Sequence, residues 1–101
     1  MSLQAAIADL VIGLESSVTV VASSASSVQI KAANDRARGV LIYNDSTAVL
    51  YLRFGTADAS TSSFTVQLAS ESYYEVPALY RGAIQGIWAS ANGNAMVTEL
   101  S

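Results

Sequence analysis

The side chains that most often carry out catalysis or bind metal ions are scarce in this sequence. It contains no histidine and no cysteine, which removes the commonest general base, the commonest nitrogen ligand of zinc and the thiolate nucleophile. Serine is abundant, but a serine nucleophile needs a neighbouring base, and Lys31 is the only lysine. The nucleophile motif G-x-S-x-G does not occur. The sequence therefore predicts a protein that is not an enzyme and that uses no cofactor.

The carboxylates remain as candidates for acid–base chemistry or for calcium binding. Glu71 and Glu75 are four residues apart, which in a strand places them on one face about 13 Å apart, too far for a glycosidase pair. No D-x-[DN]-x-[DN]-G calcium loop occurs. Acidic loop residues could still meet at one end of a β-sandwich, namely Asn34-Asp35, Asn44-Asp45 and Asp58. Solvated loop acids are the simpler interpretation, so no metal site is predicted.

Charge and hydropathy argue against nucleic-acid and membrane partners. The net charge is −3, and the five basic residues are too few for the basic stripe that neutralises phosphates. The longest uncharged stretch, residues 82–98, is interrupted by polar residues and lacks the 18 or so consecutive apolar residues of a membrane span. Residues 1–13 lack the basic start of an export signal, and the absence of cysteine fits assembly in a cytoplasm.

The low charge of the chain points towards assembly. Charged residues make up 13% of the chain, about half of the usual fraction, and small uncharged residues take their place. Charge normally keeps sheet edges and apolar patches of different molecules apart. Either the small polar residues solvate the surface adequately, or much of the surface is buried in an oligomer or lattice. We favour the second interpretation and expect a homo-oligomer, a dimer or a trimer.

Hydrophobic periodicity predicts an all-β domain over residues 15–101. Runs of β-favouring residues recur about every ten residues, which is typical of an antiparallel β-sandwich or jelly roll of about eight strands. The predicted strands are residues 17–22, 28–32, 40–43, 49–54, 64–68, 73–76, 83–90 and 95–100. Asn92-Gly93 between the last two predicts a hairpin, and residues 55–63 predict a loop at a sandwich end or an exposed tip.

The most informative block is residues 36–55. Two predicted strands, 40–43 and 49–54, flank the turn formers 44–47, which indicates a hairpin or a short crossover. Both strands are apolar at nearly every position, whereas a strand with one exposed face should alternate. One face then meets the core and the other meets a partner. The residues expected at this assembly surface are Leu41, Tyr43, Tyr51 and Arg53.

Residues 1–14 are predicted to form a separate N-terminal arm. Apolar residues recur there at helical or heptad spacing, and Ser2 is a possible helix N-cap. Asp9 and Gly13 weaken the helix, so an extended arm is an equal alternative. The segment either packs on its own domain or reaches a neighbouring subunit. Under the second alternative the contacts would be made by Leu3, Ile7, Leu10, Val11 and Leu14.

Aromatic residues are the remaining candidates for ligand binding. A sugar ring could stack on any of six side chains, namely Tyr43, Tyr51, Tyr73, Tyr74, Tyr80 and Trp88. Most of them lie within predicted strands, where aromatic rings usually fill the ends of a sandwich or an interface. We favour that simpler interpretation.

The order of strands and turns resembles a known group of proteins. Gly39 precedes an apolar strand that ends in Asn44. After this strand come, in order, L-Y-L-R-F-G, a Ser/Thr-rich loop, S-E-S-Y-Y-E-V, Y-R-G-A-I-Q-G-I-W and a terminal V-T-E strand. Over residues 36–100 this pattern resembles the small β-sandwich proteins of tailed-bacteriophage virions. The resemblance implies a structural protein made in the host cytoplasm and located on the virion. It favours a capsid decoration (cement) protein bound to the major capsid protein on the head exterior, or alternatively a tail- or fibre-associated module that binds another virion protein or a glycan receptor.

Overall fold

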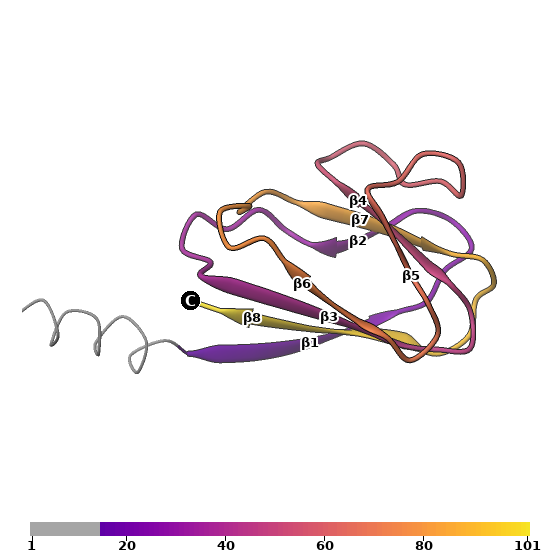
Figure 1. The fold of residues 1–101 in the computed structure, drawn as a ribbon, viewed down its shortest axis with the longest axis horizontal. Helices are drawn as coiled ribbons and strands as arrows, with labels where there is room; N and C mark the ends of the chain where they lie inside the picture. Colours follow the sequence, from indigo (N-terminus) through magenta and orange to yellow (C-terminus); the bar gives the residue numbers. More distant parts are fainter. Residues whose placement is uncertain (1–14) are drawn as a thin grey trace, which may run out of the picture.

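The computed structural model describes residues 15–101, which form two facing β-sheets (Figure 1). The predicted all-β sandwich of eight antiparallel strands is confirmed, and residues 15–101 contain no helix. The predicted arm over residues 1–14, as helix or extended chain, lies outside the described residues. The eight strands are β1 (Ser16–Ala22), β2 (Val28–Lys31), β3 (Gly39–Asp45), β4 (Leu50–Phe54), β5 (Val66–Leu68), β6 (Tyr73–Val76), β7 (Ile84–Trp88) and β8 (Asn94–Leu100).

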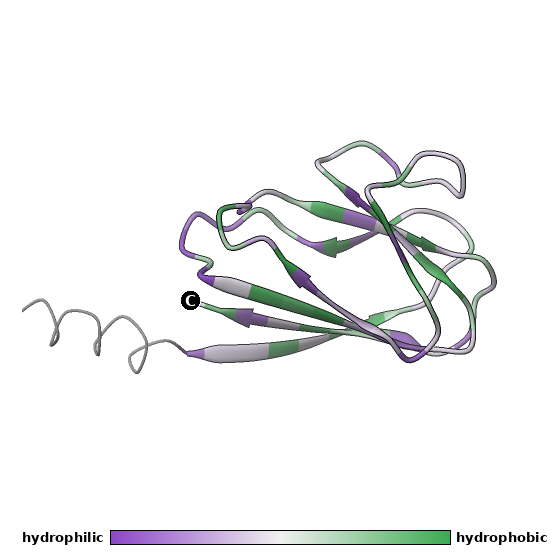
Figure 2. Ribbon diagram, in the orientation of Figure 1, coloured by the Kyte–Doolittle hydropathy of each residue, from purple (hydrophilic) through white to green (hydrophobic). Residues whose placement is uncertain are grey.

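The strands alternate between the two sheets along the chain. Sheet A has the order β1-β8-β3-β6, and sheet B has the order β2-β7-β4-β5. Every connection except β4–β5 therefore crosses from one sheet to the other, and all strand pairs are antiparallel. This order is that of an eight-stranded jelly roll. Burial alternates along β3 as such a sandwich needs, although apolar residues follow one another without interruption along part of the same strand (Figure 2).

Two turns show how local signals relate to this topology. The block at residues 36–55 forms a short crossover, because β3 belongs to sheet A and β4 to sheet B. The predicted hairpin at Asn92-Gly93 is wrong, since β7 and β8 lie in different sheets. Gly93 does adopt the turn conformation, with φ of 77°, and a Cβ there would collide with the Asp45 carbonyl. The sequence marks the reversal of the chain, but packing decides which sheet receives the next strand.

The core lies between the two sheets and is built from alternate residues of each strand. Its largest fully buried apolar side chains are Ile42, Leu50, Leu52, Ile84 and Trp88. Leu50 and Leu52 are two residues apart in β4, Ile84 and Trp88 are four apart in β7, and Leu50 is directly paired with Trp88. Their burial supplies the main favourable term for folding.

One buried polar residue, Asn44 of β3, connects the sheets. Its Oδ1 accepts hydrogen bonds from Trp88 Nε1 at 3.2 Å and from Ser46 Oγ at 2.7 Å. Its Nδ2 donates to three backbone carbonyls, those of Ala48, Leu68 and Ala69. Every polar atom of this amide is therefore satisfied, which offsets the cost of burying it. Asn44 is a structural residue inside the sandwich and is not available to a calcium ion.

Candidate interaction surface

The outer face of sheet A carries a continuous set of apolar side chains. Antiparallel register places Val20, Met96, Tyr43 and Tyr73 in one row across the four strands. The next row contains Val18, Thr98, Leu41 and Glu75. We call the apolar members of these rows the apolar face: Val18, Val20, Leu41, Tyr43, Tyr73 and Met96.

Most of the apolar face is open to solvent. Tyr73 is 66% exposed, Val18 58% and Val20 57%, while Leu41 and Tyr43 are each close to 40% exposed. These residues alternate with inward-facing ones, as Leu41 and Tyr43 do with the buried Val40 and Ile42. Scattered exposed apolar residues are ordinary on a protein surface, but a contiguous set on a flat sheet is typical of an interaction site.

The outer face of sheet B differs, because the chain itself covers much of it. Residues 55–65, here called the covering segment, leave β4 and return to β5 across this face (Figure 1). Gln85 of β7 donates its Nε2 to the Gly55 carbonyl at 3.1 Å, and Arg53 of β4 donates its Nη1 to the Asp58 carbonyl at 3.0 Å. Both side chains project from the side opposite to the core residues of their strands.

Apolar contacts complete this cover. The rings of Tyr51 and Phe64 lie 4.9 Å apart between centroids. Ala59 at the middle of the segment is only 4% exposed, and its N–H donates to Ser27 Oγ at 2.9 Å. The predicted loop at residues 55–63 is therefore packed against a sheet and does not project as a free tip.

The four strand residues predicted to form an assembly surface lie on two different faces. Leu41 and Tyr43 belong to the apolar face of sheet A. Tyr51 and Arg53 lie on the outer face of sheet B and contact the covering segment. The structure therefore does not bring the four together, and contact of any of them with a partner stays a prediction. The N-terminal candidates lie outside the described residues, namely Leu3, Ile7, Leu10, Val11 and Leu14.

Sequence reasoning did not place Val18, Val20 or Met96 at an interaction surface, and it named Tyr73 only as a candidate for stacking on a sugar. Val18 and Val20 alternate with Ser17, Thr19 and Val21, which showed a strand but not which side faces the core. Val21 pairs with the buried Ala95, so Val21 faces the core and Val18 and Val20 face outward. Only this long-range register could have revealed them.

The aromatic residues divide into buried and exposed groups. Trp88 is 1% exposed, so it cannot stack on a sugar. Tyr74 and Tyr80 pack on Phe54, with centroid distances of 6.4 and 4.3 Å. For these three residues the simpler interpretation is confirmed, because their rings fill the sandwich. Tyr43 and Tyr73 are paired in register and exposed on the apolar face.

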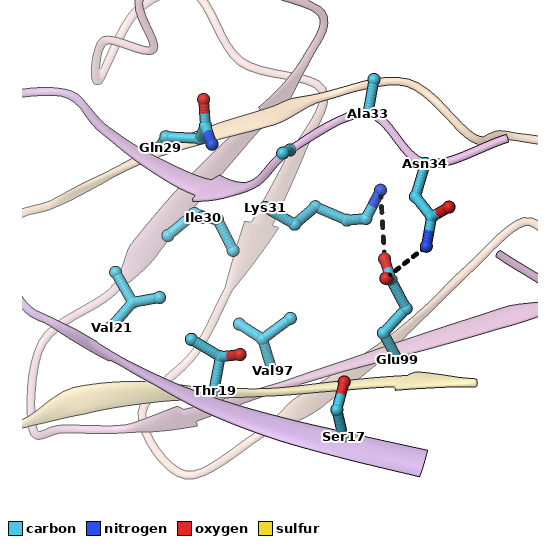
Figure 3. Close-up of a pocket in the computed structure, with 11 residues that line it drawn as sticks. Ser17, Thr19, Val21, Gln29, Ile30, Lys31, Ala33, Asn34, Val97 and Glu99 are labelled. Atoms are coloured by element: carbon cyan, nitrogen blue, oxygen red, sulfur yellow. Dashed lines mark hydrogen bonds and ion pairs between the residues drawn. The ribbon is translucent and has the colours of Figure 1, made fainter. Parts of the chain in front are cut away.

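A cleft of about 480 Å³ opens between β1 and β2, where the shorter sheet B leaves β1 uncovered (Figure 3). At one end Lys31 Nζ donates to the Gly82 carbonyl at 3.0 Å and lies 3.5 Å from Glu99 Oε2. Asn34 Nδ2 donates to Glu99 Oε1 at 2.7 Å. These polar groups satisfy one another, so the arrangement ties β2 to β8 and leaves no buried, unpaired group aimed at a ligand within residues 15–101.

Two further classes of site are absent from the described part of the chain. Within residues 15–101, no three acidic side chains gather closely enough to hold a metal ion. The same residues include no helix of the length and apolarity needed to cross a membrane.

Comparison of the chain with protein-family models, with curated proteins and with solved structures found no match. The geometry of the apolar face is therefore the main physical observation from which a function can be argued.

Proposed function

We propose that this chain is a structural protein of a tailed-bacteriophage virion, a capsid decoration protein that binds the head exterior through the apolar face of sheet A. The observation that carries the proposal is the set of apolar side chains in register across the four strands of that sheet, which are exposed on β1, β3 and β6 and half-buried on β8. The resemblance of residues 36–100 to small virion β-sandwiches supplies the choice of a virion as the assembly.

Binding by this face would stabilise a head by burying apolar area. Each 1,000 Å² of apolar surface removed from water contributes about 25 kcal/mol before the entropic and desolvation costs of association are subtracted. Many copies on one lattice would bind together, so modest individual contacts would hold adjacent capsomers against internal pressure. The arm predicted at residues 2–14 would add a second contact, and deleting it should abolish association with heads while leaving the sandwich folded.

The test is cosedimentation of the purified protein with heads from the virion whose genome encodes it. Tyr43→Asp places a charge at the centre of the apolar face, so we expect affinity for heads to fall about tenfold or more. Gln67→Asp is the matched control, because Gln67 is an exposed strand residue that faces the other side of the molecule. Thermal unfolding should show that both variants are folded. Unchanged head binding by Tyr43→Asp would contradict the proposal.

A second function is favoured by one specific observation, the exposed pair of Tyr43 and Tyr73. Two neighbouring rings on a flat sheet could stack on the sugars of a receptor glycan, which suits a tail- or fibre-associated module. The loop at residues 56–63 would not take part, because it covers the opposite outer face. A glycan array probed with the protein and with Tyr73→Ala tests this alternative: binding that is lost in the variant supports it, and a silent array rejects it.

A further inference from the structure

Strand β1 differs from the other three strands that form the edges of the two sheets. It is seven residues long, S-S-V-T-V-V-A, with no charged residue and no proline. The other edges have the features that natural proteins use to block further pairing. β6 has four residues, includes Glu75 and ends before Pro77; β2 has a register shift near Lys31; β5 has only three residues.

The backbone pattern shows which groups of β1 face away from the sheet. Glu15 and Ser101 exchange two backbone hydrogen bonds, which sets the phase of the antiparallel ladder between β1 and β8. Ser17, Thr19 and Val21 therefore direct their N–H and C=O groups to β8. The alternate residues direct theirs to the open edge, where no other strand of residues 15–101 pairs with them: Ser16, Val18, Val20 and Ala22.

We propose that this edge pairs with β1 of a second copy of the chain, in antiparallel orientation, so that two sheets A become one continuous eight-stranded sheet. The edge is self-complementary about a two-fold axis at Thr19. In that register Val18 of one copy lies opposite Val20 of the other, and Ser16 lies opposite Ala22. Every outward N–H and C=O of the four alternate residues then has a partner, which no other symmetric register achieves.

Side chains support the same register. On the outer face the pairing brings Val18 and Val20 of each copy against those of the other, and β-branched residues pack well as cross-strand neighbours. No charge within β1 opposes the approach. The pairing joins the apolar faces of the two copies and leaves Leu41, Tyr43 and Tyr73 open. It therefore does not depend on the proposed role on a virion, and it can be tested without heads.

The first test measures molar mass by light scattering over a range of protein concentrations. We expect the full chain to approach twice its mass of 10.5 kDa. In the variant Val18→Lys/Val20→Lys, lysines of the two copies lie opposite each other, so the dissociation constant should rise about tenfold or more. In Val18→Lys/Val20→Glu each lysine faces a glutamate of the other copy, and dimerisation should be retained. A wild-type chain that stays monomeric at sub-millimolar concentration would overturn the proposal.

The second test fixes the register by disulfide cross-linking, which is unambiguous because the chain has no cysteine. Thr19 faces its own counterpart at a non-hydrogen-bonded position, where Cα atoms lie about 4.5 Å apart, within the range that a disulfide spans. Thr19→Cys should therefore cross-link on mild oxidation. Ser17 faces Val21 of the other copy, which puts two Ser17→Cys residues more than about 13 Å apart. Equal cross-linking at both positions, or none at position 19, would rule out the register.

Discussion

The outer faces of sheets A and B differ in whether another described segment of the chain covers them. Both sheets have four strands whose alternate residues enter one shared core, and both carry large side chains on their outer sides. Sheet B is covered by residues 55–65 of its own chain. Sheet A has no such cover among the described residues, and its apolar face is open. An apolar outer face can thus be covered by a loop or left available to another molecule.

The chemistry of the two faces fits this difference. On sheet B, Arg53 and Gln85 donate to backbone carbonyls of the covering segment, which fixes that segment in one position. On sheet A, the row of Val20, Met96, Tyr43 and Tyr73 has few polar groups that need a fixed partner. A surface of that kind can be buried against another protein with little cost of polar desolvation.

The largest effect should come from Asn44→Leu, which breaks the connection on which both faces depend. The change removes every hydrogen bond of the buried amide and leaves Trp88 Nε1 without its acceptor. Unsatisfied buried groups cost about 1–3 kcal/mol each, so we expect the free energy of unfolding to fall by about 3–5 kcal/mol. Urea denaturation followed by tryptophan fluorescence measures this change.

Asn92→Ala is the matched control for that prediction. Asn92 also accepts hydrogen bonds through its side chain, from the Thr47 N–H and hydroxyl, but these bonds are exposed. Its loss should cost about 1 kcal/mol or less. Equal destabilisation by the two variants would show that Asn44 does not hold the sheets together as described.

The next effect compares the two outer faces directly. Ala59→Asp introduces a carboxylate within the covering segment, at a position that is 4% exposed. We expect a loss of about 3 kcal/mol in the free energy of unfolding, because the charge must be buried or the segment must detach. Tyr43→Asp on the open face should cost about 1 kcal/mol, the usual penalty of aspartate in a strand. Denaturation curves recorded at one protein concentration measure the free energy of unfolding of both variants. Similar losses in the two would mean that the two faces are equally covered.

The smallest effect concerns aromatic residues on the two faces. Phe64→Ala removes the ring that contacts Tyr51, and we expect a loss of about 1 kcal/mol with faster hydrogen exchange in residues 55–65. Tyr73→Ala removes a ring that is 66% exposed, so its loss should be about 0.5 kcal/mol or less. A Tyr73→Ala variant that is the less stable of the two would contradict the assignment of the faces.

Local patterns in the sequence predicted the strands well, because alternation and turn residues act over short stretches. Residues 40–43 and 73–76, for example, fall within strands of the structure or match them. The partners of each strand were not predictable in this way. Asn92-Gly93 marked a turn, yet β8 pairs with β1 and β3 from distant parts of the chain.

The candidate site was predictable only in part, for the same reason. The doubly apolar strand at residues 40–43 predicted that Leu41 and Tyr43 lie on the face away from the core, which is where the structure places them. The same argument applied to Tyr51 could not foresee that residues 55–65 would fold back over it. Composition identified that segment as a loop, but its final position depends on contacts with Gln85, thirty residues after Gly55.

The most direct test of the account is hydroxyl-radical footprinting of the tyrosines, on the free protein and on the protein assembled with its partner. The free protein should be modified most at Tyr73 and less at Tyr43, with Tyr51 protected by the covering segment. On assembly, Tyr43 and Tyr73 should become protected, and the modification of Tyr51 should not change. Protection of Tyr51 alone, with Tyr43 and Tyr73 still reactive, would contradict the assignment of the apolar face of sheet A as the interaction surface.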